Sequence, residues 1–405
     1  MATCPFEGRH VLLTRASGRL RSAMEVLRLA AVKRRLSSIG EKVVQKTPVK
    51  NRRWRLLQVE SSLACNLKCV MCPWKDASRN LEHQGLMPPE VWTAIKPYLD
   101  EVQSVDFTGG GEPLLQPNLA EWIDDAKKAG CETGFLSNGF LLSAKRAKGI
   151  LDAGIDWICI SMDGADAEVY ESIRKGSNFT RVCENLSRLA DMRTGHKPKL
   201  MINFVLMTIN FHQIEKMVAL AAELKVDQIN FKQCDVIRGE HGKGFGLFGN
   251  PEAKATAKLE KQLARACKRG RKLNLLTTAL AFKPEEQPVC DQNPTRSMFV
   301  RFDGSVAPCI NLAIGGPTIF LGKDAQMPQV HYGRLPDDDL LTLWQSDTCR
   351  FYRNQFQSRV EAHEKALIRG MVGGAKGFAR TKEAARKAMP EAPEGCQICH
   401  YLYGI

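Results

Sequence analysis

Long apolar runs are missing from this sequence of 405 residues. No stretch reaches the roughly 18 consecutive apolar residues that a membrane-spanning helix needs, so we expect no transmembrane segment. The N-terminus also lacks a short apolar core followed by a small-residue cleavage site, which argues against a secretory signal. These features predict a cytoplasmic globular protein, long enough for one large domain and one small domain.

Acidic residues are scarce in two peripheral segments. Residues 1–55 hold fourteen Lys and Arg against three Asp and Glu, and residues 359–389 hold eight against three. The net charge is +14, so the rest of the chain is close to neutral. The N-terminal segment offers few aromatic side chains for stacking on bases, namely Phe6 and Trp54. We therefore do not expect a nucleic-acid partner, although a non-catalytic iron–sulfur or zinc protein that binds nucleic acid is one alternative.

Residues 1–54 form a basic N-terminal extension. Within residues 16–39, apolar side chains recur at helical spacing between Arg and Lys residues, which predicts an amphipathic helix. Such a helix can pack on the protein's own body, lie on an anionic membrane surface or act as a transit peptide. Peripheral contact with an anionic membrane is therefore one hypothesis for this extension.

From residue 55, short apolar runs alternate with longer helical patterns, which predicts a parallel sheet with right-handed crossovers. The expected strands are 55–60, 103–108, 132–137, 155–161, 200–207 and 226–232. The expected helices lie near 88–100, 117–130, 143–153, 178–193, 210–224 and 251–270. Six repeats suit a partly closed α/β barrel over residues 55–283, with its chemistry at the C-terminal ends of the strands. Residues 284–405 read as a smaller α+β module.

Fourteen cysteines without a secretory signal favour metal ligation over disulfides. After the first expected strand, C-x3-C-x2-C occurs at Cys65, Cys69 and Cys72. Three thiolates on one loop can hold three irons of a cubane cluster and leave the fourth iron open for a substrate. A zinc site would need a fourth ligand, for which His83 in a polar stretch is available.

This cysteine motif, with TGGGEP after the second strand, resembles the radical S-adenosylmethionine (SAM) superfamily. The resemblance covers roughly residues 55–345 and the end of the chain. It implies a partial (βα)6 barrel and a 4Fe–4S cluster on the three cysteines whose open iron binds SAM. It also implies cleavage of SAM to a 5′-deoxyadenosyl radical, with an electron donor such as flavodoxin or ferredoxin.

The same resemblance implies a set of SAM-binding residues at the ends of strands two to four and in the helix beyond. Glycines suit a turn that must approach the ligand without a Cβ, and an arginine suits the SAM carboxylate. Ordinary turn and cap positions are the alternative for several of them. The set is Gly109, Gly110, Gly111, Glu112, Ser137, Asn138, Ser161, Asp163 and Arg174.

A second cysteine set lies in the C-terminal module, at Cys290, Cys309, Cys396 and Cys399. With Gly304 between the first two, it resembles the SPASM module in its shortened form, called twitch. The resemblance implies an auxiliary 4Fe–4S cluster whose four irons are all ligated by the protein. A tetracysteine zinc site is the alternative. The Asp-Gly pair that ends at Gly304 predicts a hairpin turn.

Two further features depart from that pattern. An insert at residues 358–393 separates a helix expected near 337–356 from the last two cysteines, and it reads as a lid or as a solvated basic helix. Cys349, on that helix, is not assigned as a ligand.

Relatives with this module oxidise sugar or cyclitol alcohols, oxidise protein side chains or cross-link peptides. We favour oxidation of a small sugar- or cyclitol-like alcohol with the auxiliary cluster as electron acceptor, because the first cluster loop reads CPW as in sugar-oxidising relatives. The N-terminal extension is also short for a peptide-recognition domain. Lys232 or Asp235, after strand six, could deprotonate the substrate radical. A peptide- or protein-modifying maturase is the alternative.

Overall fold

A computed structural model describes residues 52–74, 85–234, 238, 242, 244–247, 253–279, 284–372 and 378–405. Residues Arg53–Ile405 belong to one compact unit. The amphipathic helix expected within residues 16–39, and with it the hypothesis of membrane contact, lies outside the described residues. Among the helices of the described ranges, none is both long and apolar enough to cross a membrane.

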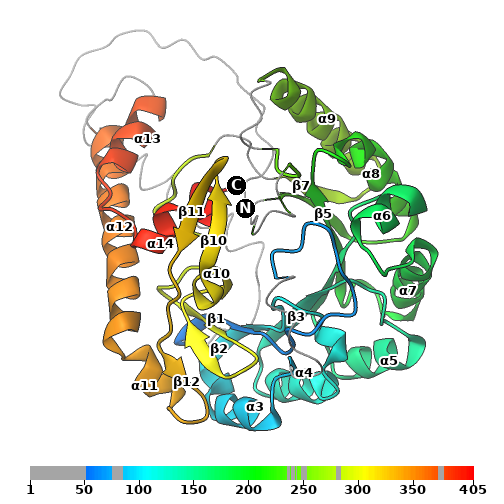
Figure 1. Ribbon diagram of the computed structural model, residues 1–405, viewed down its shortest axis with the longest axis horizontal. Helices are drawn as coiled ribbons and strands as arrows, with labels where there is room; N and C mark the ends of the chain where they lie inside the picture. The colour runs from blue at the N-terminus through cyan, green and yellow to red at the C-terminus, as the bar shows by residue number, and fades with distance from the viewer. Residues whose placement is uncertain are drawn as a thin grey trace, which may run out of the picture. The chain divides into compact units, whose positions relative to one another are not determined.

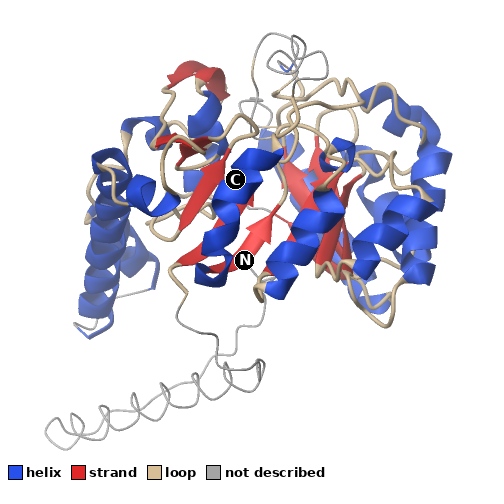
Figure 2. Ribbon diagram, turned by 90° about the horizontal axis from the view of Figure 1, so that it is seen from below, coloured by secondary structure: helices blue, strands red, loops and turns tan. Residues whose placement is uncertain are grey.

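Seven parallel strands form the curved sheet that the sequence predicts, and helices lie along its outer side (Figures 1 and 2). The strands pair in chain order: β1 (Trp54–Val59), β2 (Val102–Asp106), β3 (Glu132–Ser137), β4 (Trp157–Ser161), β5 (Lys199–Leu206), β6 (Gln228–Gln233) and β7 (Leu276–Ala279). The helices between them are α3 (Pro89–Ile95), α4 (Leu119–Lys128), α5 (Ala144–Asp152), α6 (Ala167–Ile173), α7 (Phe179–Met192), α8 (Ile214–Glu223) and α9 (Ala253–Lys272). The α/β fold is therefore confirmed. Both α6 and β7 are additions to the expected elements.

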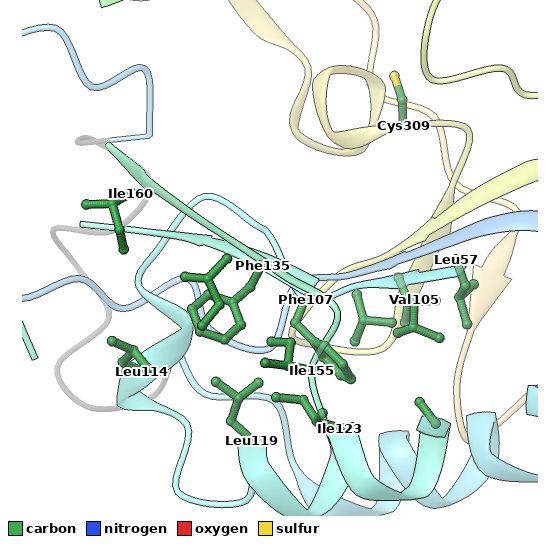
Figure 3. Packing of buried hydrophobic residues seen from close by; sticks show 14 of the residues in the cluster. Leu57, Val105, Phe107, Leu114, Leu119, Ile123, Phe135, Ile155, Ile160 and Cys309 are labelled. Atoms are coloured by element: carbon green, nitrogen blue, oxygen red, sulfur yellow. The ribbon is translucent and has the colours of Figure 1, made fainter. Parts of the chain in front are cut away.

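Side chains alternate between the two faces of each strand, as a pleated strand requires. In β5, Leu200, Ile202 and Phe204 are fully buried in the main core, whereas the residues between them are half-buried. In the first three strands and directly after β2, Leu57, Val105, Phe107 and Phe135 lie above Leu119 and Ile123 of α4 (Figure 3). The helices thus cover the outer face, and the alternate residues point to the concave side of the sheet.

The C-terminal part continues the same sheet. β8 (Ser297–Val300) pairs in parallel with β1, and β9 (Ser305–Ala307) pairs antiparallel with β8. β12 (Gly333–Arg334) follows β9, so that the sheet has ten strands in the order β12-β9-β8-β1-β2-β3-β4-β5-β6-β7. Gly304 makes the predicted hairpin turn with a φ of 88°, and a Cβ there would collide with the carbonyl oxygen of Leu335. A short helix, α10 (Ile310–Ile314), and a hairpin of β10 (Gly316–Phe320) and β11 (Lys323–Met327) complete this region.

The insert lengthens a helix. The helix expected near 337–356 is two helices, α11 (Leu340–Trp344) and α12 (Asp347–Val372), and α12 runs on because no Gly or Pro interrupts the chain between Asp347 and Arg369. α13 (Phe378–Lys387) packs beside α12, with Thr381 against Gly370. The chain ends with α14 (Glu394–Gln397) and the short turn η5 (His400–Tyr403).

Candidate active site

Cys65, Cys69 and Cys72 lie on one loop directly after β1. Cys65 is exposed, Cys69 is buried and Cys72 is half-buried. Although Cys65 as a residue is exposed, partial desolvation of its thiol, and then the nearby charges of Glu112, Cys69 and Cys72, raises the pKa of that thiol. The structure therefore brings the three predicted ligands together, and a metal that binds them must displace their protons.

Arg174, just after α6, is held beside this loop by Asp163, just after β4. Its Nη2 lies 2.6 Å from Oδ2 of Asp163, and its Nη1 lies 3.9 Å from Sγ of Cys69. Asp163 is fixed in turn by the amide of Val205, at 2.8 Å. Both members of the pair are buried, and Nε of Arg174 has no hydrogen-bond partner among the described residues. Asp163 therefore positions the arginine, and a buried donor next to the cysteine loop is left for a ligand.

The glycine-rich turn after β2 passes close to the cysteine loop. A Cβ at Gly111 would collide with the carbonyl oxygen of Ala64, so this approach requires glycine. The carboxylate of Glu112 is buried and accepts hydrogen bonds from Oγ of Ser137 and the amide of Asn138, both at 2.8 Å. Glu112 therefore fixes the end of β3, and its expected contact with SAM stays a prediction.

The end of β3 contacts the cysteine loop through two asparagines. Nδ2 of Asn138 donates to Oδ1 of Asn66 at 3.0 Å and lies 3.9 Å from Sγ of Cys65. Nδ2 of Asn66 is buried without a partner in the described ranges. Sequence reasoning missed Asn66, whose one signal is its place within the cysteine motif. Together with Nε of Arg174, these donors suit a ligand rich in carboxylate and hydroxyl oxygens, as SAM is.

One pocket in the C-terminal region is lined by Cys290, Cys309, Cys396 and Cys399. Burial, and then the charges of the other three thiols, raises the pKa of Cys396 well above its ordinary value. Cys349 is buried on α12 and is not among the residues of this pocket. No three His, Cys, Asp or Glu side chains of the described residues are placed to hold a single metal ion. Four cysteines around one pocket supply one thiolate for each iron of a cubane cluster.

Glu60, which follows β1, was not singled out from the sequence. It is fully buried, and its Oε1 accepts a hydrogen bond from the amide of Gly110 at 2.7 Å. Its Oε2 accepts from the amide of Phe302, in the β8–β9 turn, at 3.3 Å. Burial raises the pKa of Glu60 to about 7, although these amides lower it. One carboxylate thus joins the glycine-rich turn to the C-terminal hairpin.

Two protein families match this chain. The first, described as the radical SAM superfamily, matches residues 59–221, and the second, SPASM, described as an iron–sulfur cluster-binding domain, matches residues 290–366. The chain carries a radical SAM domain followed by a SPASM domain. This confirms the resemblance drawn from the cysteine motifs, and with it the cofactors, which are 4Fe–4S clusters and SAM.

Curated proteins of two kinds are similar to this chain. The tungsten-containing aldehyde ferredoxin oxidoreductase cofactor-modifying protein of Pyrococcus furiosus is 21% identical over 306 residues, covering 74% of this chain and 83% of that protein. The GTP 3′,8-cyclase of Chlorobaculum tepidum is 28% identical over 168 residues. That match covers 41% of this chain and 50% of the cyclase.

Solved radical SAM structures share the fold. SuiB of Streptococcus suis bound to SAM has a TM-score of 0.55 and 17% identity, covering 74% of this chain and 68% of that chain. The anSMEcpe structure with SAM and the Kp18Cys peptide has a TM-score of 0.56 and 18% identity, covering 75% of this chain and 83% of that chain.

The concave side of the radical SAM sheet carries a polar row. Ser161, Asn203, Asn230 and Thr278 are successive cross-strand partners on β4 to β7. Nδ2 of Asn230 donates to Oδ1 of Asn203 at 2.9 Å, and Oγ1 of Thr278 donates to Oδ1 of Asn230 at 2.6 Å. Lys232 lies on the same face of β6, two residues nearer the end of the strand. Asp235, the other predicted base, lies outside the described residues.

Proposed function

We propose that this radical SAM protein oxidises an alcohol carbon of a small, hydroxylated substrate held on the concave side of the sheet. The polar row from Ser161 to Thr278 is the observation that carries the proposal. Amide and hydroxyl groups both donate and accept hydrogen bonds, and a site built from them discriminates strongly for substrates that carry hydroxyl groups. Peptide recognition commonly uses a strand edge or an apolar groove instead, whereas this row is a line of polar side chains across the face of a sheet.

The chain's own residues would bind, orient and deprotonate the substrate. When bound, SAM and its cluster supply the radical that removes one hydrogen atom from the substrate, and the second cluster offers a place for the electron that is left. Asn203 and Asn230 hold each other in a fixed orientation, so their remaining donors and acceptors are preorganised. The candidate base is Lys232, which lies on the same face as this row, two residues nearer the end of β6 than Asn230. Cys65, Cys69, Cys72 and Arg174 would hold the first cluster and SAM, with an electron donor such as flavodoxin or ferredoxin.

The curated relatives support a small substrate. The names of the two proteins given above specify a cofactor and GTP, and GTP is a small molecule with ribose hydroxyls. The peptide seen with anSMEcpe belongs to a chain that resembles this one in fold. Peptide modification is therefore the alternative against which the experiment is designed.

The test is anaerobic turnover of the reconstituted full chain with SAM and a chemical reductant. The substrates are a panel of sugars, cyclitols, ribonucleoside triphosphates and synthetic peptides. Mass spectrometry should detect 5′-deoxyadenosine together with a small-molecule product two hydrogens lighter than its substrate. A substrate deuterated at the alcohol carbon should transfer deuterium to 5′-deoxyadenosine.

Two variants sharpen this test. Asn230→Leu should raise KM by about 10- to 100-fold, because it removes the second N–H of the amide and the hydrogen bonds that orient Asn203 and Thr278. Gln345→Leu, at an exposed position at the end of α11, is the matched control and should behave as wild type. Oxidation or cross-linking of peptides alone, or a small product of unchanged oxidation level, would refute the proposal.

A further inference from the structure

The surroundings of the auxiliary cysteine pocket contain two hydrogen-donating groups that the cysteine pattern does not explain. They are Asn311, on α10, and the cationic Arg238, which follows β6. Asn311 lines the pocket directly, together with all four cysteines. Asn311 and Arg238 are both buried, with 2% and 8% of their surface exposed, so each acts in a medium where charges interact strongly.

Asn311 donates a hydrogen bond to a cluster cysteine. Its Nδ2 lies 3.6 Å from Sγ of Cys399, within the range of N–H to sulfur contacts. Its Oδ1 is buried without a hydrogen-bond partner among the described residues, so no hydrogen bond to Oδ1 opposes the orientation in which Nδ2 faces Cys399. Cys309 caps the N-terminus of α10, and Asn311 follows two residues later, so this short helix fixes a cluster cysteine and the amide together.

Arg238 places a cation beside the same pocket. Its Nη2 donates to the carbonyl oxygen of Asn311 at 3.4 Å, and its Nη1 donates to the carbonyl oxygen of Gly315. Its guanidinium carbon lies 5.1 Å from the ring centre of Trp74, which follows Cys72 in the first cysteine loop. Burial lowers the pKa of Arg238, whereas the thiolate charges of Cys399 and Cys309 favour its charged form. The guanidinium therefore contacts both Trp74, which follows the first cysteine set, and the backbone of Asn311, which lines the auxiliary pocket.

We propose that Asn311 and Arg238 raise the reduction potential of the auxiliary cluster and so fit it to accept an electron. Reduction adds one negative charge to a cluster held by four thiolates. A hydrogen bond to a ligand sulfur and a nearby buried cation both stabilise the reduced form more than the oxidised form. Both residues are positioning residues in this role, since neither ligates iron.

This inference rests on the proposed function, because it assigns the auxiliary cluster the role of electron acceptor. It also goes further, because it names the residues that give the cluster that role. A cluster without such groups would hold its electron less readily, and oxidation of the substrate would stop at the radical stage.

The experiment measures the midpoint potential of the auxiliary cluster by EPR-monitored titration. The full chain carries Cys65→Ala, Cys69→Ala and Cys72→Ala, so that the auxiliary cluster is the one left to observe. Asn311→Leu removes the sulfur hydrogen bond, and Arg238→Met removes the charge at similar side-chain length. Arg238→Lys keeps the charge. Gln329→Leu is the matched control, since Gln329 bonds the carbonyl oxygen of Ala313 on the same helix without lining the pocket.

The midpoint potential should fall in Asn311→Leu and Arg238→Met and should stay near that of the parent in Arg238→Lys and Gln329→Leu. An unchanged potential in both of the first two variants would overturn the inference. So would loss of iron from both, because a tuning residue leaves the four ligands intact. The titration contains no substrate, so its result is independent of turnover. If the potentials fall as expected but the wild type oxidises no small molecule of the panel, the proposed function is refuted, while the effect of Asn311 and Arg238 on the potential still stands.

Discussion

Arg359 on α12 forms an ion pair with Glu286, in which Nη2 and Oε1 are 2.7 Å apart. The guanidinium, whose side chain is 1% exposed, also donates to the carbonyl oxygens of Gln287, at 3.1 Å, and Pro288, at 3.2 Å. A further hydrogen bond reaches the carbonyl oxygen of Pro390. One side chain of the insert thus holds both segments that lead into auxiliary cysteines, the one before Cys290 and the one before Cys396.

Arg359→Met should therefore destabilise the protein by about 1.5–3 kcal/mol, because it removes the hydrogen bonds of a buried charged group, whereas Glu286 is 35% exposed. Arg386→Met is the matched control. Arg386 pairs with Glu285 at 2.7 Å but is partly exposed, so its loss should cost about 0–1 kcal/mol. Anaerobic urea unfolding of the reconstituted variants measures the difference. Equal unfolding midpoints for the two variants would contradict the role of Arg359.

The iron content should divide between the two cysteine sets. Reconstituted protein should hold about eight irons, as two cubanes require. Replacing Cys65, Cys69 and Cys72 with Ala should leave about four irons and abolish formation of 5′-deoxyadenosine. Cys349→Ala, a buried cysteine outside the auxiliary pocket, should keep the full iron content. A triple variant that retains all its iron would disprove the first ligand set.

Arg174→Met should weaken SAM binding by about 10- to 100-fold, because a charge-assisted pair to a carboxylate contributes about 1.5–3 kcal/mol. Asp163→Asn should weaken it less, since the arginine stays but is less firmly held. Lys175→Met, at the exposed neighbouring position, is the control. Equilibrium dialysis with labelled SAM on cluster-loaded protein gives the dissociation constants. Identical constants for the Arg174 and Lys175 variants would exclude a SAM contact by Arg174.

Glu60 should make stability depend on pH. Its pKa is about 7 in the folded protein against an ordinary 4.5, so the folded chain binds the proton more tightly than the unfolded chain. The free energy of unfolding therefore falls as pH rises from about 4.5 to about 7. Gln does not ionise, so the Glu60→Gln variant lacks this pH dependence. The free energy of unfolding of the variant minus that of the wild type should therefore rise by about 2–3 kcal/mol from pH 5 to pH 8.

Anaerobic urea unfolding at the two pH values tests this prediction. Burial also raises the pKa of Asp106, to about 6. Asp106 therefore adds the same pH dependence to the free energy of unfolding of both proteins, and its effect cancels when the two are subtracted. A difference between variant and wild type that is the same at pH 5 and pH 8 would show that Glu60 does not titrate in this window.

The hydrophobic periodicity of the sequence was sufficient to predict most strands and helices of the barrel. All six expected strands and six expected helices are present within a few residues, because each has a hydrophobic period that its own sequence displays. α6 and β7 were missed because each is short, with seven and four residues, and such lengths carry little periodic signal. The pairing of β8 with β1 joins segments far apart in the chain, which no local pattern encodes.

The residues of the candidate site also fall into those that the sequence predicts and those that become visible only in the fold. Cysteine spacing and the glycine-rich turn predict which groups bind the cofactors, since such groups occur at fixed intervals on one loop. Asn66, Glu60 and Arg359 act on partners brought near by the tertiary fold, and a single Asn, Glu or Arg has no spacing to reveal it. Their roles become visible once burial and hydrogen-bond partners are known.

The position of β8 beside β1 has a consequence for biosynthesis. A nascent chain that has emerged only through β7 presents one edge of β1 bare, directly before the first cysteine loop, and bare edges template aggregation. That edge closes when Val300 appears and its carbonyl oxygen accepts the amide of Glu60, at 2.8 Å. The strand that carries the first cysteine loop is therefore paired on both sides only after the β8 segment has been translated.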